Sequence, residues 1–338
     1  MKKLLLSSIC VSMLAACGSN DPAEENSAEN QETSQSAEST MTTEAKSSGI
    51  ELANFDKTAR PQDDFYRYIN GTWLDNTEIP ADRSNYGSFT ALFEQSEVQM
   101  RSIIDEAAAT KDSVKGANNQ KIGDLFNAYM DIDKIEGLGI SPLKAEFDRI
   151  NKISNKAELA SHFGHAVQIG STLPLSVFVG QDRKNTTQYI TSVGQSGLGL
   201  PDRDYYFDES RAEIRTKYVE FIDKLMAFGG LKDTKQSAEK IMALETSLAE
   251  HSWTRTERRD ANATYNKMSR DEFAKVISSF DWNNYLEAAG YNTDVTDFVI
   301  NHPSYFEGFN KVYAETDLET WKNYLRYNLL NAAAAYLT

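Results

Sequence analysis

The sequence predicts a mainly α-helical fold that carries one small β-hairpin. Apolar residues recur three and four positions apart through most of the chain after residue 88, which is the spacing of one helix face. Ser269, followed three residues later by Glu272 and then by an apolar run, is a helix-start signature. A single stretch, 173–193, is rich in β-branched and aromatic residues and breaks the helical period.

The helices can be placed from their spacing and their end signals. A short first helix follows Pro61, and Gly71 is expected to end it in a left-handed conformation. The next helix should turn an apolar face inward, made of Phe89, Leu92, Phe93, Met100, Ile103, Ile104 and Ala107. Helices are expected over about 88–108, 122–130, 141–150, 155–169, 214–228, 235–252, 269–277, 281–290 and from 317 onward.

The β-hairpin should join 173–180 to 187–193 through the polar turn 182–185. A phosphate-binding loop is an alternative for the glycine-rich run after it, 197–201, but the sequence disfavours it, because no Lys-Ser/Thr pair follows and no βαβ unit surrounds it. Arg203 and Asp204, just beyond this run, are expected to form a structural ion pair or a helix cap.

The first 48 residues are expected to lie outside the fold. Residues 1–17 have a basic start and an apolar run too short to remain as a membrane span, and they end in Leu-Ala-Ala-Cys, which resembles a bacterial lipoprotein processing site. Cys17 would then carry lipid, although an ordinary secretory signal with an incidental cysteine stays possible. Residues 18–48 are acidic and Ser/Thr-rich, without an aromatic residue, which indicates a disordered tether.

Composition narrows the function classes for the folded body, 49–338. The formal net charge of the whole chain, −15, disfavours a nucleic-acid partner and electrostatic adhesion to an anionic membrane. The chain has two cysteines, Cys10 and Cys17, both in the leader, so the body has no disulfide and no thiolate metal site.

Three blocks of this chain resemble the neprilysin and endothelin-converting-enzyme family of zinc metallopeptidases. They are 63–74 with the later run Tyr86-Gly87-Ser88-Phe89, then 197–206, then 265–269. The resemblance implies a multi-helix amino-terminal lobe that sits over a catalytic lobe and encloses peptide substrates.

The zinc-binding sequence of that family, His-Glu-x-x-His, is absent from this chain. The four histidines are His162, His165, His251 and His302, and none begins that pattern. His162 and His165 could in principle hold a metal at i, i+3 spacing, but no acidic or cysteine neighbour is evident from the sequence. We therefore expect no catalytic residue, no metal site and no cofactor in this chain, with zinc in an absent catalytic half.

The resemblance also implies one substrate contact in this lobe. An arginine just before the Tyr-Gly-x-Phe run holds the carboxyl terminus of the substrate in neprilysin-like members. Here Asn85 occupies that position and cannot form a charged fork, so Arg83 is the candidate substitute.

Two functions follow as hypotheses. The first is the substrate-enclosing, amino-terminal half of a membrane-anchored zinc metalloendopeptidase, exported to the outer membrane or cell envelope and inactive by itself. The chain would then be a fragment, since its last apolar helix is still propagating at the final residues. The alternative is a free-standing surface lipoprotein that binds peptides or a partner protein without catalysis.

Overall fold

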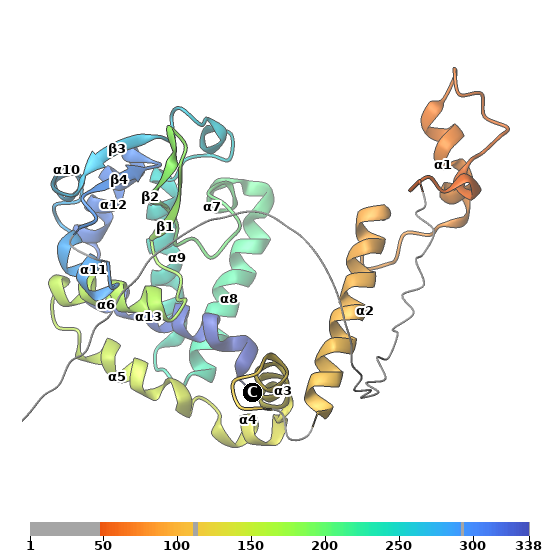
Figure 1. The fold of residues 1–338 in the computed structure, drawn as a ribbon. Helices are drawn as coiled ribbons and strands as arrows, with labels where there is room; N and C mark the ends of the chain where they lie inside the picture. Colours follow the sequence, from red (N-terminus) through yellow and green to blue (C-terminus); the bar gives the residue numbers. More distant parts are fainter. Residues whose placement is uncertain (1–47, 111–113, 292–293, 338) are drawn as a thin grey trace, which may run out of the picture. The chain divides into compact units, whose positions relative to one another are not determined.

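The computed structural model describes residues 48–110, 114–291 and 294–337, which form two compact units divided after Ala91. The described residues contain thirteen α-helices and one four-stranded sheet, which confirms the mainly α prediction (Figure 1). The predicted leader, its lipidation residue Cys17 and nearly all of the tether lie outside the described residues. Among the described helices, none is both long enough and apolar enough to span a bilayer.

The smaller unit is built around η1 (Leu52–Asn54) and α1 (Phe65–Asn76). The Asp64 side chain caps α1 by accepting a hydrogen bond from the Arg67 backbone N–H. Gly71 does not end this helix, contrary to the prediction, but lies buried within it. A Cβ at position 71 would approach Asp56 Cβ to 2.4 Å, so the glycine is required by close packing and not by a left-handed turn.

Several helices precede the sheet in the chain, and the first of them, α2, begins just before the division after Ala91. Predicted starts at Ser88, Ser141 and Asn155 agree with the structure, and Asn155 caps its helix through the Glu158 backbone N–H. These elements are α2 (Ser88–Ala109), α3 (Asn118–Met130), α4 (Ile132–Leu138), η2 (Ser141–Leu143), α5 (Lys144–Lys152) and α6 (Lys156–Gln168).

The predicted hairpin forms one half of the sheet. β1 (Leu175–Asp182) pairs antiparallel with β2 (Asn185–Gln195), and β2 pairs in parallel with β4 (Asp297–Ile300), which pairs antiparallel with β3 (Asn266–Ser269). The sheet order β1-β2-β4-β3 leaves β1 at an edge. The sequence did not reveal β3 and β4, because four residues are too few to show a two-residue period.

One face of the sheet contacts the core, and the opposite face is exposed along β1, where Phe178 is 52% exposed. Val193 and Ile300 are paired across β2 and β4 and fully buried. Ser176 and Phe178 of β1 lie on the opposite face with their cross-strand partners in β2, since side chains alternate along a strand.

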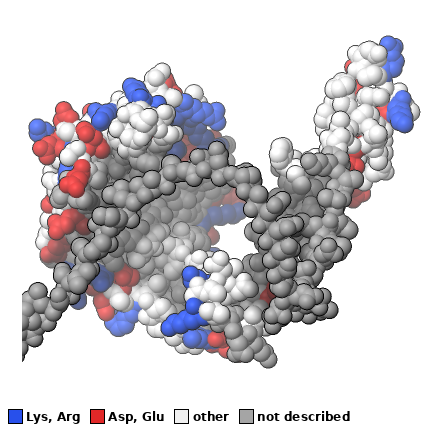
Figure 2. All heavy atoms as spheres, viewed as in Figure 1, with Lys and Arg blue, Asp and Glu red and all other residues white. Residues whose placement is uncertain are grey.

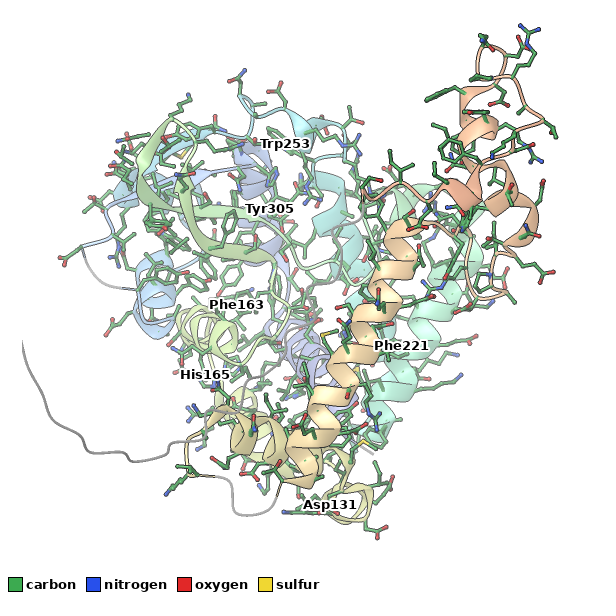
Figure 3. All side chains as sticks on the ribbon, turned by 45° about the vertical axis from the view of Figure 1, so that its right-hand side comes forward. Asp131, Phe163, His165, Phe221, Trp253 and Tyr305 are labelled. Atoms are coloured by element: carbon green, nitrogen blue, oxygen red, sulfur yellow. The ribbon has the colours of Figure 1, made fainter. Side chains whose placement is uncertain are left out.

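The remaining helices enclose an aromatic core. Figure 3 shows Phe163 of α6 inside the larger unit and His165, two residues on, toward its outside. Phe163 contacts the rings of Phe280, Tyr313 and Trp321. The helices are α7 (Asp204–Phe207), α8 (Ala212–Phe228), α9 (Thr234–His251), α10 (Arg270–Val276), α11 (Trp282–Ala288), α12 (Pro303–Glu315) and α13 (Leu318–Ala333).

The last helix is central to this core. Asp317 caps α13 as predicted, by accepting from the Thr320 N–H, and Trp321, Leu325 and Leu330 are buried. The apolar stripe of α13 is therefore covered over most of its length by the lobe itself.

Helix α2, unlike α13, leaves most of its apolar face exposed, contrary to the prediction. Of the face expected to point inward, only Ala107 is buried and Ile104 is half-buried. Phe93, for example, is 56% exposed, and Phe89, Leu92, Met100 and Ile103 are exposed as well. The helical period identified an apolar face correctly, but it could not say that this chain leaves the face uncovered.

Candidate functional site

The predicted carboxylate-binding residues lie in the loop between α1 and α2, in the smaller unit. Arg83 is half-buried and its backbone N–H bonds to the Pro80 carbonyl, while Asn85 is exposed. Both residues therefore lie in one loop, two positions apart in the sequence.

The described residues do not fit a zinc ion. No group of three His, Cys, Asp or Glu side chains among them is arranged to hold a metal. His162 is 8% exposed, and burial lowers its pKa to about 4, while His165 Nε2 lies 2.7 Å from a Glu146 oxygen. The prediction that this pair has no acidic neighbour is wrong, because α5 brings Glu146 to His165.

The glycine-rich block after the hairpin is held by a buried carboxylate. Glu245 of α9 is fully buried and accepts hydrogen bonds from the Gly199 N–H at 3.1 Å and from the hydroxyls of Tyr206 and Tyr218 at 2.6 and 2.9 Å. The Leu200 N–H in turn donates to the Tyr206 hydroxyl. These bonds join α7, α8 and α9 to the loop.

Burial dominates the electrostatics of that carboxylate. It raises the pKa of Glu245 from 4.5 to about 7, although the three hydrogen bonds act in the opposite direction. In the described contacts, no cationic side chain donates to the Glu245 carboxylate, so no positive charge offsets the desolvation that penalises its ionisation. The carboxylate acts as a hydrogen-bond acceptor that connects elements of the core.

Arg203 and Asp204 do not form the predicted ion pair. Arg203 Nε donates to the Ala249 carbonyl, and the adjacent ion pair is between Arg255 and Asp202, at 2.6 Å. Asp202, not Asp204, accepts the hydrogen bond that starts α7.

A groove of about 410 Å³ crosses the outer face of the sheet at the β1–β2 end. Gly194 forms part of its floor, and a Cβ there would contact Ser176 Oγ, Asn301 Nδ2 and His302 Cε1 at 3.1 to 3.7 Å. The lining side chains include two arginines and no carboxylate; they are Ser176, Phe178, Gln181, Arg183, Ser192, Gln195, Arg258, Thr264, Asn301 and His302.

Gln195, at the end of β2, organises one side of this groove. Its side-chain amide exchanges two hydrogen bonds with the backbone of Trp253, at 2.8 and 3.1 Å, and its backbone N–H donates to His302 Nδ1 at 3.1 Å. Figure 3 shows Trp253 in the loop that follows α9, close to the hairpin end of the unit and above Tyr305. The loop that carries Arg258 is thereby fixed beside the sheet.

His302 is neutral and has a defined tautomer. Burial, reinforced by the nearby charge of Arg258, lowers its pKa to about 4. Because Nδ1 accepts from Gln195, the ring proton is on Nε2, so this buried imidazole is a hydrogen-bond donor. Sequence reasoning considered His302 only as a histidine outside a zinc motif and missed Arg258 and Asn301, since these residues come together only in the folded chain.

The comparisons identify the class of protein. The family model described as peptidase family M13, in its amino-terminal part, matches residues 61–338. This chain therefore belongs to peptidase family M13, as the amino-terminal region of that family.

The sequence relatives are longer proteins. Human endothelin-converting enzyme 1 is 26% identical over 299 residues, which cover 85% of this chain and 38% of the human protein. Endothelin-converting enzyme-like 1 of Mus musculus is 26% identical over 312 residues, covering 85% of this chain and 39% of its own length. This chain thus spans about two-fifths of these relatives.

The solved structures agree. The zinc metalloprotease Zmp1 of Mycobacterium tuberculosis, in complex with an inhibitor, is 36% identical with a TM-score of 0.77, over 86% of this chain and 45% of that chain. PepO from Lactobacillus rhamnosis, at 20% identity and a TM-score of 0.65, shares the fold over 83% of this chain and 44% of its own. The resemblance proposed from the three sequence blocks is confirmed.

Proposed function

We propose that this chain is the substrate-enclosing, amino-terminal half of a zinc metalloendopeptidase that acts on peptides, with zinc and the general base supplied by a second, catalytic half. The observation that carries the proposal is the family match over residues 61–338. Support comes from the relatives, of which this chain covers 38% to 45%, and one of which is named as a zinc metalloprotease.

The exposed apolar side chains of the larger unit support the same assignment. Beyond α2, they include Leu125, Tyr129 and Met130 at the end of α3, and Ile214, Phe221 and Phe228 along α8. Large apolar side chains that stay exposed in such number are a feature of interfaces. The occupant that we propose is the catalytic half, since the relatives extend well beyond the matched region.

The direct test is to read the DNA beyond the Thr338 codon and to produce the joined protein. We expect a continuing frame with His-Glu-x-x-His, about one zinc per chain, and hydrolysis of a quenched fluorescent peptide that a chelator abolishes. A clean stop codon with no second half elsewhere would leave a peptide-binding lipoprotein without catalysis, which is the alternative function.

We further propose that Arg83 binds the carboxyl terminus of the substrate in the joined protein, in place of the arginine that Asn85 replaces. Arg83→Ala should reduce the preference for free over amidated peptide ends by about tenfold, and Asn85→Arg should increase it. Equal preferences in wild type and Arg83→Ala would exclude this role.

We also propose export as a lipoprotein anchored through Cys17, with residues 18–48 as the tether of the folded domain that starts near residue 49. The support is the Leu-Ala-Ala-Cys sequence after a basic and apolar leader. Metabolic labelling with radioactive palmitate should mark the wild-type chain and not Cys17→Ala, and fractionation should place only the wild type in the outer membrane. Labelling of both would refute it.

A further inference from the structure

We propose that the groove on the outer face of β1 and β2 is a docking site for an extended peptide that carries a carboxylate, and that this peptide pairs with the free edge of β1. The site is formed within the larger unit, so the inference does not depend on a catalytic half.

The first argument is the charge of the groove lining. The chain as a whole has 50 acidic residues against 35 basic ones, yet the lining has Arg183 and Arg258 and no acidic side chain. On the face seen in Figure 2, several Lys and Arg side chains gather at the top of the larger unit, where Figure 1 places the hairpin and its neighbouring loops. A carboxylate is the ligand group that complements such a lining.

The two arginines are not neutralised by carboxylates. Arg183 donates to the Thr264 carbonyl and hydroxyl at 2.8 and 3.3 Å, and neither Arg183 nor Arg258 has an ion pair among the described contacts. The nearby Asp182 is 2% exposed and already accepts from the Lys184 N–H and the Tyr265 hydroxyl. The positive charge of the groove is therefore left for a ligand.

The second argument is the floor of the groove. Gly194 leaves space where a side chain would contact Asn301 and His302, and Ser176 and Ser192 on either side are small and polar. His302, 6% exposed, is fixed through Nδ1 and keeps its proton on Nε2. The floor thus combines donors with room for a side chain of modest size.

The third argument is the edge of the sheet. β1 has one neighbour, β2, in the described sheet, and its residues from Leu175 to Gln181 include no charge and no proline. A shift in the strand register between Gln181 and Asp182 lies at the hairpin end of β1 and leaves the preceding residues regularly paired. Phe178 and Val179 are 52% and 61% exposed. Edge strands are usually blunted by lysine, proline or bulges, and an unprotected one is a template for an added strand.

The geometry joins these features. In an added strand, every second side chain lies on the groove face, beside Ser176 and Phe178. A peptide with acidic residues at alternate positions would pair its backbone with β1 and place its carboxylates on the groove face, which Arg183 and Arg258 line.

The test uses the full chain and a fluorescein-labelled octapeptide with blocked ends that alternates valine with glutamate, measured by fluorescence anisotropy. The comparison probes replace glutamate by glutamine, or N-methylate the alternate valines so that the backbone cannot pair. We expect the glutamate peptide to bind at least about tenfold more tightly than either comparison peptide, with an affinity that falls as salt rises.

A matched pair of variants tests the site. Arg258→Gln should weaken binding of the glutamate peptide by about tenfold, whereas Arg259→Gln, which removes the same charge from the next residue outside the groove lining, should leave it within about twofold. Both variants alter exposed residues, so folding is preserved.

Three binding results would overturn the proposal, and one sedimentation result would do so as well. They are equal binding of the glutamate and glutamine peptides, equal losses in the two arginine variants, and undiminished binding of the N-methylated peptide. Pairing of β1 with a second copy, seen as a dimer in sedimentation that the glutamate peptide does not dissociate, would also overturn it.

Discussion

At the scale of single residues, buried polar groups fix the position of the loop at 197–200 through directional hydrogen bonds. Glu245 connects three helices to the loop at 197–200, and Tyr324 of α13 binds the Gly197 carbonyl of the same loop at 2.8 Å. Tyrosine hydroxyls and one carboxylate thus hold the backbone of the Gly-Leu-Gly-Leu-Pro block in place. None of these contacts could be predicted from the sequence, because their partners lie 27 to 127 positions apart.

Glu245 should make the stability of the lobe pH-dependent. Its folded pKa of about 7 lies above the ordinary 4.5, so the folded state retains a proton that the unfolded state has lost. This contribution is fully present below about pH 4.5 and is lost as the pH rises through about 7, a change on the order of 3 kcal/mol. We expect Glu245→Gln to remove this pH-dependent contribution to stability. The urea midpoint of the variant should therefore vary less with pH than that of wild type between about pH 5 and pH 8.

The pH dependence of the urea midpoint must be compared between the variant and wild type, because His162 and His302 also change the stability with pH, in the opposite direction. Their folded pKa values of about 4 lie below the ordinary 6.5, so their contribution is lost as the pH falls from about 6.5 through 4. Glu250→Gln, on the exposed side of the same helix, is the matched control and should keep the wild-type slope. An unchanged slope in Glu245→Gln would contradict the assignment.

At the scale of elements, the features that the sequence predicted correctly are those that depend on residues close together in the chain. The capping box at Ser269 and Glu272, the Asp281 and Asp317 caps and the hairpin turn are all present, since each depends on residues within a few positions. The prediction missed the helices α4, α7 and α12 and the two short strands, and it placed Gly71 wrongly at the end of a helix. Those features depend on tertiary neighbours, which no spacing reveals.

Helices α6 and α11 approach closely because of Gly164. A Cβ at this position would meet the Tyr285 carbonyl oxygen at 2.3 Å and Ala288 Cβ at 2.8 Å. Gly164→Ala should therefore force the helices apart and lower the free energy of unfolding by about 1–3 kcal/mol, measured by urea denaturation.

The control for this prediction is Gly137→Ala. Gly137 lies in α4, where an added Cβ would have no atom within 4 Å, and its φ is not positive. This substitution should be neutral or stabilise by up to about 1 kcal/mol, since alanine favours helix. If both alanine variants gave the same change, close packing of α6 on α11 would not be the reason for the glycine.

The capping box of α10 offers a second check on an element. Ser269 Oγ accepts from the Glu272 N–H at 3.2 Å, while the Glu272 carboxylate accepts from the Ser269 N–H at 2.8 Å. Ser269→Ala should cost about 1 kcal/mol, seen in the urea midpoint, and Ser269→Asp should recover most of it, because aspartate also caps. Ser279→Ala, at an exposed position outside a cap, should change the midpoint little.

At the scale of the whole molecule, the core and the surface of the larger unit differ in how completely they are packed. The core is complete: α13 is buried by its own lobe, and aromatic rings from several helices and their flanking loops meet around Phe163 and Phe280. The surface nevertheless retains exposed apolar faces on α2, α3 and α8. A complete core with uncovered apolar faces is what a lobe that docks on a second body requires.

This leads to a prediction for the chain as it stands. Phe93 is exposed on the apolar face of α2, so Phe93→Glu should leave the free energy of unfolding within about 0.5 kcal/mol of wild type. We also expect it to reduce concentration-dependent self-association, because exposed apolar patches promote association and the substitution would place a charge in this one. Sedimentation velocity over a range of concentrations measures the second effect.

Gln95→Glu is the control that separates the effect of the α2 face on self-association from the effect of an added charge alone. Gln95 is exposed on the opposite side of the same helix, about 200° away, so the substitution adds a charge outside the patch. Self-association that both variants reduce equally would show general charge repulsion, and the α2 face would then not be an interface. A reduction confined to Phe93→Glu identifies that face as the surface to be covered, and the same variant should then weaken assembly with a catalytic half by about tenfold or more.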